Sequence, residues 1–184
     1  GKHKAGNYAE AIIISQEFHK ALVGIPKPTF FEKRNNVWSV ADRIAWGEQP
    51  FLDFSLTKDY FQNLSTLLTQ NKLPDQIIHG DWGHGNILFD KDDKPVIIDF
   101  CPYWRPADFS IAIMIVDALA YEGANVSIID LCANINDFNQ LLLRALTRRI
   151  CEYIGHQTHP KNTQDRSKDI NVHLDLFNLL FRKK

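Results

Sequence analysis

The chain has 184 residues, 45% of them hydrophobic and 23% charged, and its formal net charge is −1 at pH 7. This composition is ordinary for a globular protein with its own core and excludes a disordered or fibrous chain. A charge so close to zero provides no basic field for nucleic acid or an anionic membrane, so we expect neither as a partner.

The cysteines and the longest apolar stretch indicate the cellular compartment and whether the chain crosses a membrane. The cysteines are Cys101, Cys132 and Cys151, and no two form a CxxC pair. An odd number at this spacing predicts reduced thiols in a cytoplasmic protein rather than a disulfide framework. The longest apolar stretch, Phe109 to Ala120, is too short to span a bilayer and indicates a buried helix.

Helical periodicity dominates the first part of the chain. Apolar residues at helical spacing predict one helix from Tyr8 to Leu22 and a second from Lys58 to Gln70. Between them the pattern is mixed, and Ser39 is the expected N-cap of a short helix from Val40 to Trp46. The apolar face of the first helix is expected to consist of Ala11, Ile14, Phe18 and Ala21.

A glycine-rich loop and two short strands follow. Residues 79–86 read HGDWGHGN after an apolar run, and the three glycines predict unusual backbone angles. Residues 87–89 and 95–98 predict a β-hairpin whose polar turn centres on Asp92 and Asp93.

The rest of the chain is expected to be helical after an aromatic loop at residues 100–106. The predicted helices cover residues 108–121, 126–135, 138–154 and 170–181, with a polar loop at 156–169. This order of helices, a small central hairpin and more helices predicts a mainly helical α+β fold.

The predicted turn determines which residues face each other across the hairpin. Pairing Ile87 with Ile98 places Asn86 opposite Asp99, at roughly 4.5–5.5 Å. An amide and a carboxylate then meet at the open end of the hairpin, and Asp81 lies on the loop just before it.

Carboxylates at close range repel one another, and a divalent cation offsets that cost. Oxygen ligands of this kind suit Mg²⁺, which binds a few protein oxygens together with water and substrate phosphates. We therefore expect Asn86 and Asp99 to be metal ligands. Asp81 is left to orient an acceptor hydroxyl and take its proton, a role that needs a carboxylate within hydrogen-bond reach.

The interval from His79 through Asp81 to Asn86 is that of the kinase catalytic loop, and Asp99-Phe100 stands where kinases carry the metal-binding Asp-Phe-Gly. With these motifs the chain resembles the aminoglycoside phosphotransferase and choline kinase-like family over most of its length. The resemblance implies a protein-kinase-like C-terminal lobe that uses ATP as phosphoryl donor and Mg²⁺ as cofactor. It also implies Asp81 as the catalytic base, with Asn86 and Asp99 as the metal ligands.

Two further motif residues have structural roles under this resemblance. His79 is expected to hydrogen-bond the backbone near the metal loop, and Asp108 to help fix that loop while capping the helix that follows. Gly80 replaces the Arg of the protein-kinase motif, and Cys101 replaces the Gly of Asp-Phe-Gly. Both departures favour a kinase of small molecules.

No glycine-rich phosphate-covering loop and no strand lysine precede His79. The resemblance therefore implies that the family's N-terminal, ATP-gripping lobe is absent from this sequence. We interpret residues 1–184 as a single domain, the catalytic lobe, and expect the chain to be a fragment or a truncated form of a longer protein.

Five residues near the predicted site are candidates for contact with the acceptor. They are Trp82, His84, Tyr103, Trp104 and Arg105. Each has a structural alternative: the aromatic rings would pack in the core, the histidine would be an exposed loop residue, and the arginine would form a surface ion pair.

The preferred hypothesis is transfer of a phosphoryl group from ATP to a hydroxyl of a small molecule. One alternative is a non-catalytic binding module that keeps the kinase shape. Another is a metal-dependent hydrolase with His79 and Asp81 as ligands. Neither the acceptor nor the oligomeric state follows from the motifs, because a fold hosts many functions.

Overall fold

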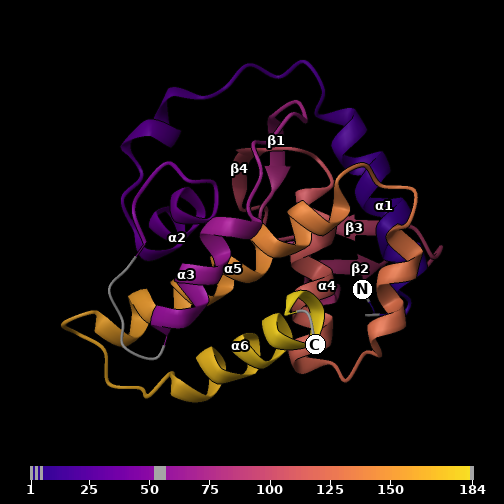
Figure 1. Ribbon diagram of the computed structural model, residues 1–184. Helices are drawn as coiled ribbons and strands as arrows, with labels where there is room; N and C mark the ends of the chain where they lie inside the picture. The colour runs from indigo at the N-terminus through magenta and orange to yellow at the C-terminus, as the bar shows by residue number, and fades with distance from the viewer. Residues whose placement is uncertain (1, 3, 5, 52–56, 183–184) are drawn as a thin grey trace. The chain divides into compact units, whose positions relative to one another are not determined.

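The computed structural model describes residues 2, 4, 6–51 and 57–182 (Figure 1). The protein is mainly helical with two small antiparallel sheets, an α+β fold. Its contacts divide the chain into two compact units. The first consists of Gly1–Lys33 and Lys72–Leu142, and the second of Arg34–Asn71 and Leu143–Lys184.

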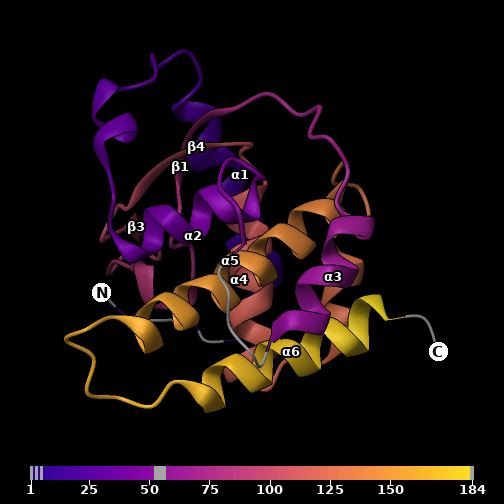
Figure 2. The ribbon, with the colours of Figure 1, turned by 60° about the vertical axis from the view of Figure 1, so that its left-hand side comes forward.

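The first unit holds both sheets and the predicted site. Its helices are α1 (Tyr8–Ala21) and α4 (Phe109–Tyr121), with 3₁₀ segments at Thr29–Lys33, His84–Asn86 and Val126–Cys132. Its strands are β1 (Gln76–His79), β2 (Ile87–Phe89), β3 (Pro95–Ile97) and β4 (Pro102–Arg105). Helix α1 lies beside α4 and β1, as the two ribbon views show (Figures 1 and 2).

The second unit is helical in its described part. It holds α2 (Val37–Ala45), α3 (Lys58–Leu67), α6 (Ser167–Phe181) and most of α5 (Phe138–Thr158), which begins in the first unit. A buried hydrogen bond joins the hydroxyls of Tyr60 in α3 and Thr147 in α5 at 2.7 Å. Gly155 lets α5 pack against α2, because a Cβ there would lie 2.7 Å from Cγ1 of Val37.

Most predicted helices are confirmed, with shifted ends. Helix α2 begins at Val37 rather than Val40, because Asn36 is its N-cap and its side chain accepts a hydrogen bond from Ser39 N at 2.9 Å. Ser39 is therefore a helical residue, and the predicted cap was wrong. Helix α3 ends at Leu67 because Leu68 is extended, with ψ of 130°.

The C-terminal half shows similar shifts. Helix α5 continues to Thr158 and α6 begins at Ser167, so the polar connection between them is shorter than predicted. The predicted helix at 126–135 is a 3₁₀ segment that ends at Cys132. Helix α4 confirms the buried apolar helix, since all its residues from Phe109 to Val116 are buried.

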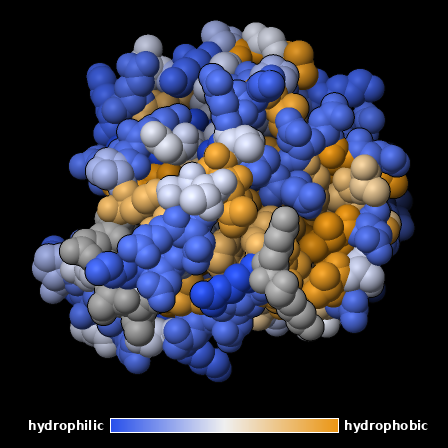
Figure 3. Space-filling view, viewed as in Figure 1, coloured by the Kyte–Doolittle hydropathy of each residue, from blue (hydrophilic) through white to orange (hydrophobic). Residues whose placement is uncertain are grey.

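The buried face of helix α1 overlaps only partly with the predicted one: Ala11 is buried, and Ile14 and Phe18 are half-buried. Its buried residues are Ala11, Ile12, Ser15 and His19, whereas Ala21 is exposed. The buried face therefore carries two polar side chains, which must find hydrogen-bond partners inside the unit. Apolar side chains of α1 such as Ile13 are exposed. Figure 3 shows hydrophobic atoms on the surface near α1 and the 3₁₀ segment after α4.

The register of the β2–β3 hairpin differs by one residue from the prediction. Ile87 pairs with Ile97 rather than with Ile98. The cause is the turn, in which the backbone N–H of Asp90 donates to Lys94 O at 3.0 Å and Asp93 has φ of 62°. The turn is therefore a three-residue loop whose last residue has a left-handed backbone. The prediction had assumed a turn centred on Asp92 and Asp93, which shifts the pairing by one residue.

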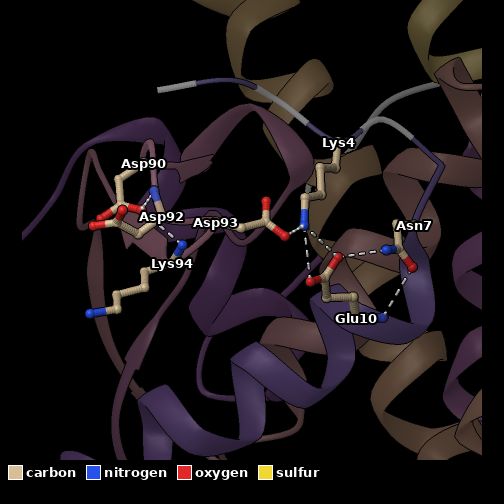
Figure 4. A network of polar contacts seen from close by, with 7 residues as sticks. All are labelled: Lys4, Asn7, Glu10, Asp90, Asp92, Asp93 and Lys94. Carbon is tan, nitrogen blue, oxygen red and sulfur yellow. Dashed lines mark hydrogen bonds and ion pairs between the residues drawn. The ribbon is translucent and has the colours of Figure 1, made fainter.

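The residues before α1 contact this hairpin. Lys2 forms an antiparallel bridge with Phe89 at the edge of β2. The ammonium of Lys4 lies 2.8 Å from a carboxylate oxygen of Asp93 and 3.3 Å from one of Glu10, and Figure 4 shows this network joining the turn to the start of α1. The segment therefore links the turn of the hairpin to the first helix.

A fourth strand replaces part of the predicted aromatic loop. Strand β4 pairs antiparallel with β1, with Gln76 opposite Arg105 and His79 opposite Pro102. Tyr103 and Arg105 are buried and alternate with half-buried neighbours. Pro102 starts the strand, where a missing N–H is tolerated.

Two further findings concern the thiols and membrane-spanning segments. The thiols of Cys101, Cys132 and Cys151 are free, and the last two are buried. Within the described ranges, no helix combines the length and the apolar character that crossing a bilayer requires.

Candidate active site

Two nested antiparallel ladders build the site. The outer ladder, β1 with β4, continues one step past His79, where Gly80 N donates to Cys101 O at 2.7 Å. The inner ladder, β2 with β3, continues one step outward, where Ile98 N donates to Asn86 O at 3.0 Å. The chain between the two ladders consists of residues 81–85 on one side and 99–100 on the other, so these residues meet at one junction.

Asp81 and Asn86 are in direct contact at this junction. The side-chain amide of Asn86 donates to the backbone carbonyl of Asp81 at 2.7 Å, and its Nδ2 lies 3.4 Å from Oδ2 of the same residue. The backbone of Asn86 is fixed as well, since its N–H donates to Gly83 O at 2.9 Å. Because Nδ2 faces Asp81, the Oδ1 atom of Asn86 is the part of the amide available to a ligand.

Asp99 occupies the other side of the junction. It is not opposite Asn86, as the predicted register required; that position belongs to Ile98. Asp99 follows Ile98 with φ of 50° and an exposed side chain. A left-handed backbone is uncommon for a residue other than glycine, although aspartate tolerates it better than most. This turn takes the chain from the inner ladder to the outer one.

His79 links the two sides of the junction. Its Nδ1 lies 3.1 Å from the backbone N of Asp81, and its Nε2 lies 3.1 Å from Ile98 O. A backbone N–H can only donate, so Nδ1 is the acceptor, and Nε2 carries the proton that it donates to Ile98. The predicted hydrogen bond from His79 to the backbone near the metal loop is confirmed.

The electrostatics of His79 show that both acids lie near it. Burial lowers the pKa of the imidazole, whereas the carboxylates of Asp81 and Asp99 each act to raise it. Both ring nitrogens are already used, so His79 has no nitrogen to offer a metal ion. The geometry therefore gives no support to the hydrolase hypothesis, which required His79 as a ligand.

Packing explains one glycine of the glycine-rich loop, Gly80, whereas nothing lies within 4 Å of a Cβ added to Gly83 or Gly85. None of Gly80, Gly83 and Gly85 has a positive φ, so the predicted unusual angles are wrong. A Cβ on Gly80 would overlap the ring of Tyr103, with Cε2 of that ring only 2.7 Å away. An arginine at this position, as in protein kinases, is excluded by the same overlap.

Trp82 and Tyr103 belong to the core rather than to an open pocket. Trp82 is fully buried, its indole N–H donates to Ala11 O at 3.3 Å, and its ring lies 5.5 Å from that of Phe18. Tyr103 is buried against Gly80. The packing alternative therefore holds for both, and only Trp104 of the three aromatic candidates is half-buried.

His84 and Arg105 also differ from their predicted surroundings. His84 is buried, its Nδ1 lies 3.1 Å from a carboxylate oxygen of Glu122, and its ring packs edge-on against Tyr8. Tyr8 donates to the same carboxylate at 3.0 Å, and burial is the main cause that raises the pKa of its phenol to about 12. Arg105 is buried too, so neither residue is the exposed side chain that the structural alternatives assumed.

Asp108 precedes α4 but does not cap it with its side chain. Its backbone is helical, and no side-chain capping hydrogen bond is present. Burial raises the pKa of its carboxyl group. The contact from α4 to β1 comes instead from Ser110, whose hydroxyl lies 2.9 Å from His79 O.

Two residues of the site escaped the sequence analysis, Ser110 and His19. His19 lies on the buried face of α1, and its Nε2 accepts a hydrogen bond from His79 N at 3.0 Å. Polar side chains at the four-residue spacing of Ser15 and His19 on an otherwise apolar helix were the available signal. Only the position of β1 shows what they contact.

Asp81, Asn86 and Asp99 thus gather at the open end of the β2–β3 hairpin, next to strand β1, which packs against α1. The phosphotransferase enzyme family matches residues 8–121 of the 184, a range that holds α1, both sheets and α4. The chain belongs to this family. No curated protein and no solved structure matches the chain.

Proposed function

We propose that this chain carries the catalytic and metal-binding part of an ATP- and Mg²⁺-dependent phosphotransferase that acts on a hydroxyl group of a small molecule. The observation that carries the proposal is the contact between Asn86 and Asp81 at a junction that also holds Asp99. This junction lies inside the range that matches the phosphotransferase family.

The residues present fit a magnesium ion. Asn86 presents Oδ1 and Asp99 presents an exposed carboxylate, and both are the hard oxygen donors that Mg²⁺ prefers. In the part of the chain that the structure describes, no three His, Cys, Asp or Glu side chains gather closely enough to hold a metal ion by themselves. That suits a cation that completes its shell with water and nucleotide phosphates. When bound, Mg²⁺ would neutralise the charge on those phosphates.

Asp81 is assigned the role of base. Its carboxylate is exposed, while its backbone is held by His79 at the N–H and by Asn86 at the carbonyl. In the proposed reaction the acceptor oxygen bonds to the γ-phosphorus as the bond to the β–γ bridging oxygen breaks, leaving ADP. The acceptor's proton passes to Asp81. The fixed backbone serves positioning, which is the main source of catalysis in this chemistry.

The decisive test replaces Asp81 by Ala in the full-length protein and measures phosphotransfer from Mg-ATP to a panel of hydroxyl compounds. We expect turnover to fall by roughly 10²–10⁴-fold while nucleotide affinity is kept, because a positioned base contributes about that much. Turnover at the wild-type rate would remove the assignment. Nucleotide binding without transfer by the wild-type protein would favour the non-catalytic module.

The metal assignment is tested by titration calorimetry with Mg-ATP. Asp99→Asn should weaken binding roughly 10–100-fold, the range seen for damage to a metal's ligand shell. Asparagine keeps the tolerance for a left-handed backbone, so the change isolates the charge. Asp92→Asn, which removes a charge from the exposed turn of the same hairpin, is the matched control and should leave affinity unchanged.

A further inference from the structure

We propose that His19 is a positioning residue for the catalytic loop, holding the backbone of His79 and through it the base; the inference rests on the phosphotransfer proposed above. His19 lies on α1, far from the glycine-rich loop in sequence, and is 1% exposed. Its Nε2 lies 3.0 Å from the backbone N of His79. Its Nδ1 lies 2.7 Å from Ser15 O.

These partners decide the form of the imidazole. The backbone N–H of His79 can only donate, so Nε2 of His19 must accept, and Nδ1 must carry the hydrogen that goes to Ser15 O. Burial lowers the pKa of His19 to about 4, so the neutral ring is the form present near neutral pH. The contact is thus a fixed acceptor aimed at one backbone N–H.

The ladder explains why His79 needs such an acceptor. Gly80 N donates to Cys101 O, so the alternation of an antiparallel pair points the N–H and C=O of His79 away from β4. Among the described residues, no third strand lies on that edge of β1. His19 takes up the N–H, and the hydroxyl of Ser110 donates to the carbonyl at 2.9 Å. Two side chains replace a missing strand at the catalytic end of β1.

A second contact ties the same residue of α1 to the other end of the strand. The side-chain amide of Gln76 donates to the backbone carbonyl of His19 at 2.8 Å. β1 is therefore held by residue 19 at both its first and its last residue. Beyond that last residue, the ring of His79 accepts the backbone N–H of Asp81 at 3.1 Å, so the constraint reaches the proposed base.

The test compares two substitutions of different reach. In His19→Gln the amide oxygen reaches about as far as Nε2 and can accept from His79 N, whereas the shorter side chain of His19→Asn cannot. Amide hydrogen exchange is measured on the full chain. In His19→Asn the backbone amides of His79 and Asp81 should exchange roughly tenfold faster than in wild type. This increase should exceed what the change in global stability, measured by urea denaturation, accounts for. His19→Gln should restore protection to within about threefold of wild type.

Turnover supplies the readout that a purely structural role would not move. In His19→Asn the kcat for Mg-ATP-dependent transfer should fall roughly tenfold at unchanged KM for Mg-ATP, with His19→Gln recovering most of it. Ser110→Ala removes a single hydroxyl and should also lower kcat and speed exchange of the same amides. It replaces His19→Asn in the test if that variant does not fold. Exchange that rises evenly across the chain, or an unchanged kcat despite faster local exchange, would overturn the proposal. The exchange measurement tests only the positioning role of His19. The proposed function is tested separately by Asp81→Ala, so failure of one can be told from failure of the other.

Discussion

Asn86 binds the backbone of Asp81 through its side-chain amide, with Nδ2 2.7 Å from the carbonyl oxygen. The two residues are five positions apart, so this hydrogen bond joins the two ends of the glycine-rich loop. The backbone N–H of Asn86 also closes a turn by donating to Gly83 O. One side chain is thus placed to do two things: to hold the proposed base and to present an oxygen to a metal ion.

Substitutions of Asn86 should separate these two roles. Asn86→Asp keeps a ligand oxygen but loses the N–H donor, so Mg-ATP affinity should stay within about threefold of wild type while kcat falls roughly tenfold. Asn86→Ala loses both, so affinity should fall as well. Calorimetry and steady-state kinetics measure the two quantities. Equal affinities for Asn86→Ala and wild type would exclude Asn86 as a ligand.

The close approach of Gly80 to Tyr103 predicts a stability effect that requires no knowledge of the reaction. Gly80→Ala forces a methyl group into the tyrosine ring and should lower the free energy of unfolding by about 1–3 kcal/mol. Gly83→Ala is the control, because nothing lies within 4 Å of its added Cβ and φ is −164°. Urea denaturation that finds the two variants equally stable would contradict the packing argument.

The left-handed backbone of Asp99 predicts that function and stability oppose each other there. With φ of 50°, Asp99→Gly relieves strain, and the variant should be more stable than Asp99→Ala by about 1 kcal/mol. Both variants should lose Mg-ATP affinity, since both lack the carboxylate. Thermal or urea unfolding beside calorimetry provides the comparison, and a less stable glycine variant would refute the strain.

His19 predicts a dependence of stability on pH. Its pKa is about 4 in the folded protein against an ordinary 6.5, mainly because the ring is buried. Below pH 6.5 the unfolded chain takes up a proton that the folded one does not, so stability falls as pH drops toward 4. The loss attributable to His19 is at most about 3 kcal/mol.

The measurement is the difference in unfolding free energy between wild type and His19→Gln at several pH values. The pKa of His79 is lowered too, and its effect has the same sign. This effect is present in both proteins, so the difference between them contains the titration of His19 and its repulsion with His79. The wild type should lose stability relative to the variant from pH 6.5 down to pH 4. Parallel curves would show that His19 does not titrate as its burial requires.

Much of this protein follows from local sequence. Helix α1 follows from its own periodicity and α4 from its continuous apolar stretch, and the spacing of Asp81 and Asn86 is a property of the loop itself. These features depend on neighbours within a few residues, so pattern and spacing were enough to predict these two helices and the closeness of Asp81 to Asn86.

The rest was decided by the geometry of one turn and by partners distant in the sequence. Asp93 changed the register of the hairpin by adopting a left-handed backbone, and a shift of one residue moved Asp99 away from Asn86. Strand β4 was missed because a four-residue segment becomes a strand only when β1 lies beside it. The contact between His19 and His79 spans sixty positions of sequence, and such a hydrogen bond forms only where packing brings two buried polar groups together.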